Sequence, residues 1–566
     1  MSKTELKIIS SLAKVFPDSA PPVRTEKCLF STLAGETVSF QVAYLHGENS
    51  RQWGVLHIEG PPFMRLNIRR VRQIQGQIPA HFKADYGYIS TKEGLYPDLL
   101  EDYEKQTEAG TNRLPLTPFS WQCAWVDVSF APSAPHGHYS VKAIIKKHDG
   151  EILAQAKTSI EYIPMSLPDL EIPRTQWFHV DCLAEYYGVK AFSERHWEII
   201  ENFASYAVEH GINTLLTPIH TPPLDTEVGG ERLTVQLIEV SVESNGRKCE
   251  EWVYSFDFTK FERWVAMCKR IGVKFYEMAH LFTQWGAKHA PKIMGTVDGK
   301  YVRMFGWDTE ASGPEYANYL KQMLFALTVK LREMGIADKT IFHISDEPDK
   351  EHRNAYREAR KIVEPFLKDF KVVDALSNYE LFKTGEVSVP VAAVDNIEPF
   401  LKGNVPELWC YYCCAQSYKV PNHFFMQPSY RNRILGTLMY KFNISGFLHW
   451  GYNFYKCMHS VYPIDPFRTT DADGTFPSGD AFMVYPGKDG KPLASLRLMV
   501  AQEAFNDYRA FLLLESKIGR AAVLELIDGD MENKLTFSCY PQNEEFLLDL
   551  RRRVNAAIYR SANFEK

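Results

Sequence analysis

The sequence predicts a multidomain protein in which an N-terminal all-β sandwich is followed by a (β/α)8 barrel with C-terminal helical decoration. Three observations carry this prediction. Residues 1–170 alternate polar and apolar side chains in short runs, residues 171–518 alternate strand-like with helix-like segments, and residues 519–566 have a helical pattern. A chain of 566 residues, 45% of them hydrophobic, is also long enough for two or three domains.

The N-terminal part is predicted to consist of strands connected by turns. Alternating runs rich in β-branched and aromatic residues cover residues 37–44, 53–58, 123–130 and 139–145. Stretches rich in proline and glycine, such as residues 131–138, separate the runs and are typical of loops. The proline-rich segment 162–173 then marks the end of the sandwich, because proline interrupts both helices and strands.

From residue 171 onwards strands and helices alternate, which is typical of a parallel barrel. The predicted strands are residues 176–181, 212–219, 273–281, 340–345, 372–376, 392–397, 408–414 and 446–453. The predicted helices are residues 193–210, 257–270, 314–334, 349–369, 430–442 and 494–514. Helical patterns between the fifth, sixth and seventh strands are weak. The C-terminal extension ends with a predicted helix at residues 544–559.

Composition and charge narrow the possible partners. A net charge of -6 and an isoelectric point near 6.3, without a lysine and arginine cluster, argue against a nucleic acid or an anionic membrane as the main partner. The N-terminus lacks the apolar run of a signal peptide, and no run of 18 apolar residues occurs. We therefore expect a soluble, cytoplasmic protein without membrane insertion. Composition leaves the oligomeric state open.

The 10 cysteines are scattered, as expected of free thiols in a reducing compartment. Their one cluster, Cys410, Cys413 and Cys414, could suggest a metal. It lies in an apolar strand pattern and has no second ligand pair at zinc spacing, so packing in the core is favoured. The sequence predicts neither a metal nor another cofactor.

Polar and aromatic residues gather at the predicted C-terminal ends of the barrel strands, where barrel enzymes have their active sites. These residues are His179, Asp181, His220, His280, His343, Asp346, Glu347, Asn378, Asp395, Tyr411, Tyr412, Trp450, Tyr452 and Asn453. A sugar needs such a mixture, because its ring stacks on an aromatic face and its hydroxyls need hydrogen-bonding partners. The sequence therefore predicts a carbohydrate site.

Several of these residues have a second interpretation. The histidines can be packed or hydrogen-bonded side chains without contact to a ligand. Trp450 and Tyr452 can both belong to the core, although the position of Trp450 favours it as the stacking platform. Asp395 can serve only to satisfy a neighbouring backbone group.

The adjacent acids Asp346 and Glu347 are the strongest candidates for chemistry. They follow a β-branched and aromatic strand, and Pro348 stops the strand before a charged helix begins. This strand-to-helix junction lies at the mouth of the predicted barrel. The alternative is that the two carboxylates cap the following helix, whose N-terminus favours negative charge.

Glycoside cleavage usually takes two carboxyl groups on opposite sides of the scissile bond. The end of the predicted seventh strand, where many retaining barrels place a nucleophile, offers Tyr411 and Tyr412 but no acid, and Glu407 lies at its other end. Adjacent side chains such as Asp346 and Glu347 lie on one side of a bound ring. This geometry suits substrate assistance, in which the 2-acetamido oxygen of the sugar attacks its own anomeric carbon.

The order of sandwich and barrel, together with four motifs, resembles glycoside hydrolase family 123 over nearly the whole chain. The motifs are His343-Ile-Ser-Asp346-Glu347-Pro348, Trp450-Gly-Tyr452-Asn453, Tyr485-Pro-Gly487 and Ser495-Leu-Arg497. The resemblance implies a retaining, substrate-assisted β-N-acetylgalactosaminidase acting on an oligosaccharide or glycoconjugate that ends in β-linked N-acetylgalactosamine. It also implies that Asp346 orients the acetamido group and that Glu347 is the general acid and base. The galacto preference rests on the resemblance alone.

Two other functions are compatible with the sequence. Histidine and aspartate at several strand ends allow a metal-dependent barrel hydrolase, although His179 and Asp181 form the one closely spaced pair. A carbohydrate-binding barrel without catalysis is the second alternative, and the acid pair argues against it.

Overall fold

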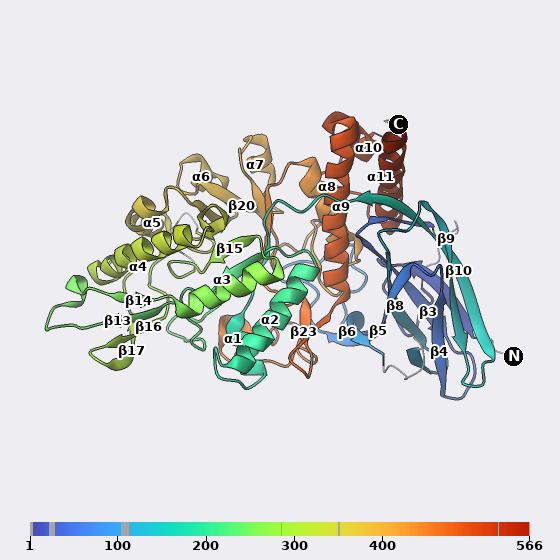
Figure 1. Cartoon of the computed structure of the whole chain (residues 1–566), viewed down its shortest axis with the longest axis horizontal. Helices are drawn as coiled ribbons and strands as arrows, with labels where there is room; N and C mark the ends of the chain where they lie inside the picture. The colour runs from blue at the N-terminus through green and yellow to red at the C-terminus, as the bar shows by residue number, and fades with distance from the viewer. Residues whose placement is uncertain are drawn as a thin grey trace.

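The structure, a computed structural model, describes residues 4–21, 29–103, 112–284, 286–348, 351–529 and 531–564. Figure 1 shows a helix-covered barrel and a β-sandwich side by side, with the C-terminal helices at the junction between them. The predicted fold class is confirmed: two N-terminal sheets, a closed parallel barrel and terminal helices follow one another along the chain. The division into residues 1–170, 171–518 and 519–566 stays a prediction.

The sandwich consists of two five-stranded sheets. One has the order β1 (Glu5–Ser10), β3 (Thr37–Leu45), β8 (Trp121–Phe130), β5 (Met64–Gly76) and β6 (Gly94–Asp102), all antiparallel. The other has the order β2 (Leu29–Ala34), β10 (Ile152–Ser166), β9 (Gly137–Lys146), β4 (Gln52–Glu59) and β7 (Asn112–Leu116), in which only the β2–β10 pair is parallel.

The first of these sheets is buried on both faces. Phe40 and Val42 of β3 point into the core between the two sheets. Ala43 on the same strand, and Trp125 on β8, belong to the larger core that continues into the barrel. Because successive residues of a strand face opposite sides, this one sheet joins the two hydrophobic cores.

The barrel is closed by eight parallel strands. In order they are β11 (Arg174–Gln176), β12 (Thr214–Thr217), β15 (Phe275–Met278), β18 (Thr340–Phe342), β19 (Lys371–Leu376), β20 (Val389–Ala393), β21 (Trp409–Tyr411) and β22 (Gly446–His449), and β22 pairs with β11. Leu216, Ile341, Val373 and Val391 fill its interior. Branched apolar residues are the usual filling of such a barrel.

Helices pack around the strands. They are α1 (Val180–Tyr186), α2 (Glu194–Glu209), α3 (Thr259–Ile271), α4 (Pro314–Glu333), α5 (Arg353–Leu367), α6 (Tyr379–Lys383), α7 (Glu398–Lys402) and α8 (Tyr430–Lys441). Helices α2, α3, α4 and α5 bury mainly an apolar face, whereas α8 is buried almost all round. The Ser193 side chain caps α2 by accepting a hydrogen bond from the backbone N–H of His196, as a serine at this position commonly does. The five-residue helices α6 and α7 explain the weak patterns between the fifth and seventh strands.

Two predicted strands are too long, and two small sheets were not predicted. The predicted strand 446–453 ends at His449 as β22. The predicted strand 176–181 is shorter, because β11 ends at Gln176 and residues 180–181 already belong to α1. The loops after β12 and β15 form an unpredicted four-stranded sheet, β13 (Glu239–Val242), β14 (Ser255–Asp257), β16 (Ile293–Val297) and β17 (Lys300–Phe305). The loop after β22 likewise contains an unpredicted pair, β23 (Val484–Pro486) and β24 (Pro492–Ala494).

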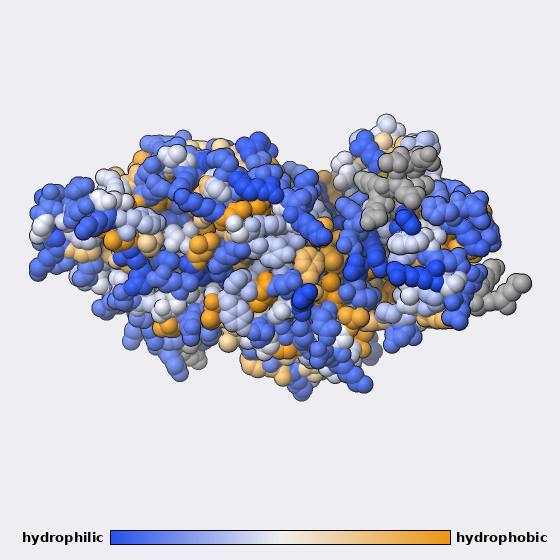
Figure 2. All heavy atoms as spheres, turned by 90° about the horizontal axis from the view of Figure 1, so that it is seen from below, coloured by the Kyte–Doolittle hydropathy of each residue, from blue (hydrophilic) through white to orange (hydrophobic). Residues whose placement is uncertain are grey.

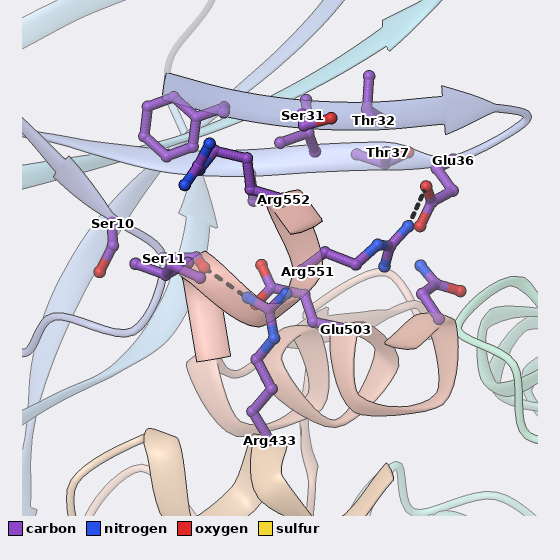
Figure 3. Close-up of a pocket in the computed structure, with 15 residues that line it drawn as sticks. Ser10, Ser11, Ser31, Thr32, Glu36, Thr37, Arg433, Glu503, Arg551 and Arg552 are labelled. Atoms are coloured by element: carbon purple, nitrogen blue, oxygen red, sulfur yellow. Dashed lines mark hydrogen bonds and ion pairs between the residues drawn. The ribbon is translucent and has the colours of Figure 1, made fainter. Parts of the chain in front are cut away.

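The C-terminal helices α9 (Leu496–Ile518), α10 (Arg520–Asp528) and α11 (Glu544–Phe564) connect the barrel to the sandwich. Figure 3 shows a pocket at this junction, in which arginines of α8 and α11 approach acids of α9 and the sandwich. Arg551 lies 2.5 Å from Glu36 and 2.9 Å from Asp507, and Arg433 lies 2.8 Å from Glu503. The pair between Arg551 and Glu36 joins α11 to the sandwich, and the other two pairs join α11 and α8 to α9.

Hydrophobic residues on the face shown in Figure 2 are divided into small patches by hydrophilic side chains. Among the described residues, no helix has the length and apolar composition needed to cross a membrane.

Candidate active site

A pocket with a cavity volume of about 150 Å³ opens at the C-terminal ends of the barrel strands. Its lining comes from the loops that follow most of the strands. The lining residues are Trp177, Leu224, Asp225, Gln284, Asp346, Glu347, Ala375, Tyr411, Cys413, Cys414, Leu448, Trp450 and Phe476. The structure therefore brings together four of the predicted site residues: Asp346, Glu347, Tyr411 and Trp450.

Asp346 and Glu347 both face this pocket because the backbone leaves the strand conformation before it reaches them. Strand β18 ends at Phe342, and Glu347 has a φ of +47°. In a regular strand two successive side chains would point to opposite sides. A left-handed residue other than glycine is uncommon and concentrates at functional sites. Helix α5 begins only after His352, so its cap residue is not part of the acid pair.

The surroundings of the pair favour proton retention. Burial raises the pKa of Asp346 well above its usual value, the neighbouring charge of Glu347 raises it further, and positively charged His343 opposes the shift. Burial also raises the pKa of Glu347, while a hydrogen bond from Tyr411 lowers it. That bond runs from the Tyr411 hydroxyl to Glu347 Oε1 over 2.7 Å. Two close carboxyl groups of this kind titrate as one unit.

A buried charged layer lies directly beneath the pair. His343 Nε2 is 2.6 Å from Glu277 Oε1, and His343 Nδ1 is 3.7 Å from Asp374 Oδ1. Burial alone would lower the pKa of His343, but the Asp374 and Glu277 carboxylates overcome this and raise it to about 9. Glu277 also accepts a hydrogen bond from the Trp177 indole over 2.9 Å. The layer thus holds a positive charge below Asp346 and fixes an aromatic wall of the pocket.

Trp450 forms another wall and is held by groups behind it. Its Nε1 donates to Asp480 Oδ2 over 3.0 Å, and its ring contacts Phe476 edge-on at a centroid distance of 5.1 Å. His449 Nε2 lies 3.4 Å from the other oxygen of Asp480. A half-buried indole held at its polar edge leaves part of its ring for stacking on a sugar.

Asp225 brings a third carboxylate into the pocket. It lies in the long loop between β12 and β13, with a φ of +40°. Its backbone N–H donates to Gln284 Oε1 over 2.6 Å, and its Oδ2 accepts from the backbone N–H of His459 over 3.0 Å. Burial raises its pKa to about 6. These two bonds fix the loop and hold the carboxylate toward the pocket.

Four predicted site residues lie in the protein interior and outside the pocket lining. The Tyr452 hydroxyl donates to a backbone carbonyl of α2 over 3.1 Å. Asn453 accepts from the His179 backbone N–H at 2.8 Å and donates to its carbonyl at 3.0 Å. Asp181 forms a buried ion pair of 2.7 Å with Arg232. These residues were predicted as site residues because the strands β11 and β22 were expected to extend further than they do. In the structure their side chains support the loops around the site.

The remaining predicted residues also stand back from the pocket lining. His220 Nε2 lies 2.8 Å from the His280 carbonyl, and both histidines are buried. Tyr412 packs in the core on the face of the chain opposite to Tyr411. Asn378 caps α6. Asp395 is exposed and accepts a hydrogen bond of 3.1 Å from Gln416, and its charge raises the pKa of Glu347.

Sequence reasoning missed several lining residues. Trp177 and Cys413 follow from strand alternation once the strand ends are known, because Cys413 lies two residues after Tyr411. Asp225, Gln284 and Phe476 lie in long loops, where no periodic pattern connects them with a strand end.

One group among the described residues could hold a metal ion: His423, His449 and Asp480, all buried behind the pocket. The backbone N–H of Gly451 donates to His449 Nδ1 over 3.2 Å, so a neutral His449 carries its proton on Nε2, the atom that faces Asp480. A metal ligand must present an unprotonated nitrogen. Arg497 adds positive charge next to His423. The donor set therefore does not fit a metal as it is hydrogen-bonded here.

Comparison with known proteins places the chain in a family. Residues 177–514 match the profile described as "Glycoside hydrolase 123, catalytic domain". No curated protein matches in sequence. A family 123 glycoside hydrolase from Clostridium perfringens, whose structural analysis concerned glycolipid glycan hydrolysis, has a similar fold with a TM-score of 0.72 at 14% identity, covering 99% of this chain and 98% of that one.

A putative β-galactosidase from Bacteroides fragilis is a more distant match, with a TM-score of 0.32 and 8% identity over 88% of this chain and 60% of that one. That likeness carries no argument. The profile match, however, covers more than half of the 566 residues and contains the acid pair and the pocket. The resemblance found in the sequence is thus confirmed, and the chain belongs to glycoside hydrolase family 123.

Proposed function

We propose that this glycoside hydrolase is a retaining exo-enzyme that removes terminal β-linked N-acetylgalactosamine by substrate-assisted catalysis. The observation that carries the proposal is the pair Asp346 and Glu347, which are adjacent in sequence and line one pocket together. No other carboxylate of that lining follows a barrel strand directly, since Asp225 comes from the middle of a loop. The pair therefore acts from one side of the sugar, and the sugar supplies its own nucleophile.

Glu347 is the general acid and base in this proposal. Its Oε1 accepts the Tyr411 hydroxyl, which leaves Oε2 to carry the proton. Burial raises the pKa of Glu347, which favours retention of that proton. In the first step the acetamido oxygen bonds to C1, the bond from C1 to the leaving oxygen breaks, and the Glu347 proton passes to that oxygen. In the second step Glu347 takes a proton from water, and the water oxygen opens the oxazolinium ring at C1.

In this proposal Asp346 carries the negative charge of the pair, against the rise in its pKa that burial and the neighbouring carboxylates cause. The positive His343 beneath it favours the ionised form of Asp346 once Glu347 holds the shared proton. An ionised Asp346 accepts the acetamido N–H, aims its carbonyl oxygen at C1, and stabilises the positive charge that develops on the acetamido group. Trp450 provides the stacking face, and the oxygen of Asp225 that faces the pocket accepts sugar hydroxyls.

The proposal is tested with a panel of aryl β-glycosides of N-acetylgalactosamine, N-acetylglucosamine and galactose. We expect the N-acetylgalactosaminide to be hydrolysed fastest and the galactoside to be nearly inert, because galactose lacks the internal nucleophile. Comparable turnover of the galactoside would contradict the mechanism. Hydrolysis of any of the three excludes a barrel that only binds carbohydrate, and full activity after exhaustive chelation excludes a metal-dependent hydrolase.

A further inference from the structure

We propose that the loop between β5 and β6 of the sandwich forms, together with the loop after β21, a binding surface for the sugars that precede the terminal residue of the substrate. The inference rests on the proposed function. Its ligand class is a neutral oligosaccharide chain, held outside the pocket by exposed aromatic rings. The surface is defined by Phe82, Lys83, Tyr86, Tyr418 and Lys419, and we call it the rim surface.

The sandwich loop lies at the mouth of the barrel because it contacts the loops that leave the C-terminal ends of two strands. The Tyr88 hydroxyl donates to the Ser417 carbonyl over 2.7 Å, in the loop after β21. The backbone N–H of Gln77 donates to the Ser478 hydroxyl over 2.8 Å, in the loop after β22. These two barrel loops also supply Cys414 and Phe476 to the pocket lining. The sandwich loop thus packs against two of the loops that line the pocket.

A buried carboxylate anchors the loop. Asp85 is 8% exposed and its Oδ1 pairs with Arg431 Nη2 of α8 at 2.5 Å. Its Oδ2 accepts the backbone N–H of Lys419 over 2.6 Å, and its Oδ1 accepts that of Gly87 over 2.8 Å. Burial opposes ionisation of Asp85, but these partners lower its pKa and keep it charged. The rings on either side of Asp85 are therefore presented by a fixed loop, which reduces the entropy cost of binding.

Phe82 and Tyr86 are the two most exposed aromatic side chains among the described residues, and Tyr418 is also exposed. Phe82 is 78% exposed, Tyr86 80% and Tyr418 41%. The Lys83 ammonium lies 4.7 Å from the Tyr418 ring centroid, and the Lys419 ammonium lies 5.8 Å from that of Tyr86. Exposed apolar side chains that gather in one place commonly mark an interaction site, whereas single ones are normal.

This combination of groups fits sugars. Aromatic rings stack on the apolar face of a sugar ring, and ammonium groups and phenol hydroxyls donate hydrogen bonds to its oxygens. An enzyme that takes a terminal sugar into its pocket leaves the preceding sugars of the chain at the rim. Tyr418 lies in the same loop as the pocket residue Cys414, four residues further along the chain, so the rim surface adjoins a loop that lines the pocket.

The test compares substrates that do and do not occupy the rim surface. Wild type and the variants Tyr86→Ala, Tyr418→Ala and their combination are assayed with an aryl β-N-acetylgalactosaminide, with a soluble oligosaccharide ending in β-linked N-acetylgalactosamine, and with the same glycan on a lipid in vesicles. Phe119→Ala is the matched control, because Phe119 is a 61% exposed aromatic residue of the sandwich outside the rim surface.

We expect the double variant to raise KM for the soluble oligosaccharide about tenfold, the effect expected from the loss of one stacking contact. We expect kcat/KM for the aryl glycoside to stay within about twofold. Equal losses on the two substrates, or no loss on either, would overturn the inference. A loss confined to the vesicle-bound glycan would also overturn it and assign the surface to lipid. Failure of the proposed function is distinct, because the wild type would then leave the aryl glycoside intact.

Discussion

At Glu347 the backbone adopts a left-handed conformation, with a φ of +47°, in a segment beyond the end of β18 where two successive carboxylates line one pocket. The cost of such a conformation is on the order of 1–3 kcal/mol for a residue with a side chain. The fold carries this cost at the position where the proposed mechanism needs two acids on the same side of a sugar.

The Tyr411 hydroxyl controls how tightly Glu347 holds its proton. Its hydrogen bond favours the ionised carboxylate and thereby lowers the pKa of Glu347. In the Tyr411→Phe variant this effect is lost, so the pKa of Glu347 rises and the residue stays protonated to a higher pH. We predict a bell-shaped dependence of kcat/KM on pH whose alkaline limb moves to higher pH in the variant, whereas the acidic limb, which reports the charge of Asp346, moves less.

The measurement is kcat/KM with an aryl glycoside from pH 4 to about 10 for both proteins, a range chosen to span ordinary and raised carboxyl pKa values. A flat profile in the wild type, or an alkaline limb that moves to lower pH in Tyr411→Phe, would contradict the assignment.

At the scale of elements, patterns in the sequence predicted what depends on local periodicity. The barrel strands, the long helices and the position of the acid pair after β18 followed from apolar alternation and from Pro348. Helices α6 and α7 were not predicted, because five residues are too few to show a helical period. The four-stranded sheet of β13, β14, β16 and β17 was not predicted, because β13 pairs with β16, about fifty residues later in the chain, and only folding brings these strands together.

The site was predictable to the same extent. Asp346, Glu347, Tyr411 and Trp450 follow strands directly and were predicted, while Asp225 enters the pocket from a loop whose path depends on its bonds to Gln284 and His459. Tyr452 and Asn453 were predicted as site residues because they lie close to the end of a strand in the sequence. In the structure they form hydrogen bonds with backbone groups of the core and do not line the pocket.

The ends of β15, β18 and β19 are joined by His343 between Glu277 and Asp374, and this joint makes stability depend on pH. The folded-state pKa of about 9 lies above the ordinary value of 6.5, so the contribution of His343 is complete below pH 6.5 and is lost as the pH rises through 9. The difference corresponds to roughly 3 kcal/mol.

We predict that the unfolding free energy of the wild type falls over this window by more than that of His343→Gln, as measured by urea unfolding at several pH values. Other groups titrate in the same range, such as Glu503, because burial raises the pKa of Glu503 to about 7. Their contributions to the unfolding free energy are the same in both proteins and cancel in the difference. Equal falls in both proteins would show that His343 is not charged in the folded state.

At the scale of the whole molecule, a buried ion pair attaches the sandwich to the barrel loops. Asp98 of β6 lies 2.9 Å from Arg497 and accepts the Tyr485 hydroxyl over 2.6 Å. Tyr485 and Arg497 belong to the motifs that first indicated the family, and their place in the structure is architectural. The same strand carries Glu101, whose ion pair with Arg72 is exposed.

Asp98→Asn leaves the buried Arg497 without its charged partner, so we predict a loss of about 3–5 kcal/mol in the free energy of unfolding. Glu101→Gln on the same strand is the matched control and should change it by less than about 1 kcal/mol. Urea unfolding measures both. If the two variants lose the same amount, the buried pair does not carry the attachment.

The measurement that tests the central claim most directly is the leaving-group dependence of Glu347→Gln and Asp346→Asn. Loss of the proton donor in Glu347→Gln should cost about a hundredfold to ten-thousandfold with a poor leaving group and far less with a nitrophenolate, which needs little protonation. Loss of the charge in Asp346→Asn should slow every substrate alike, because each one forms the same oxazolinium-like intermediate. Rescue of Asp346→Asn but not of Glu347→Gln by a good leaving group would reverse the two roles, and full activity of both variants would show that the acid pair is not the catalytic site.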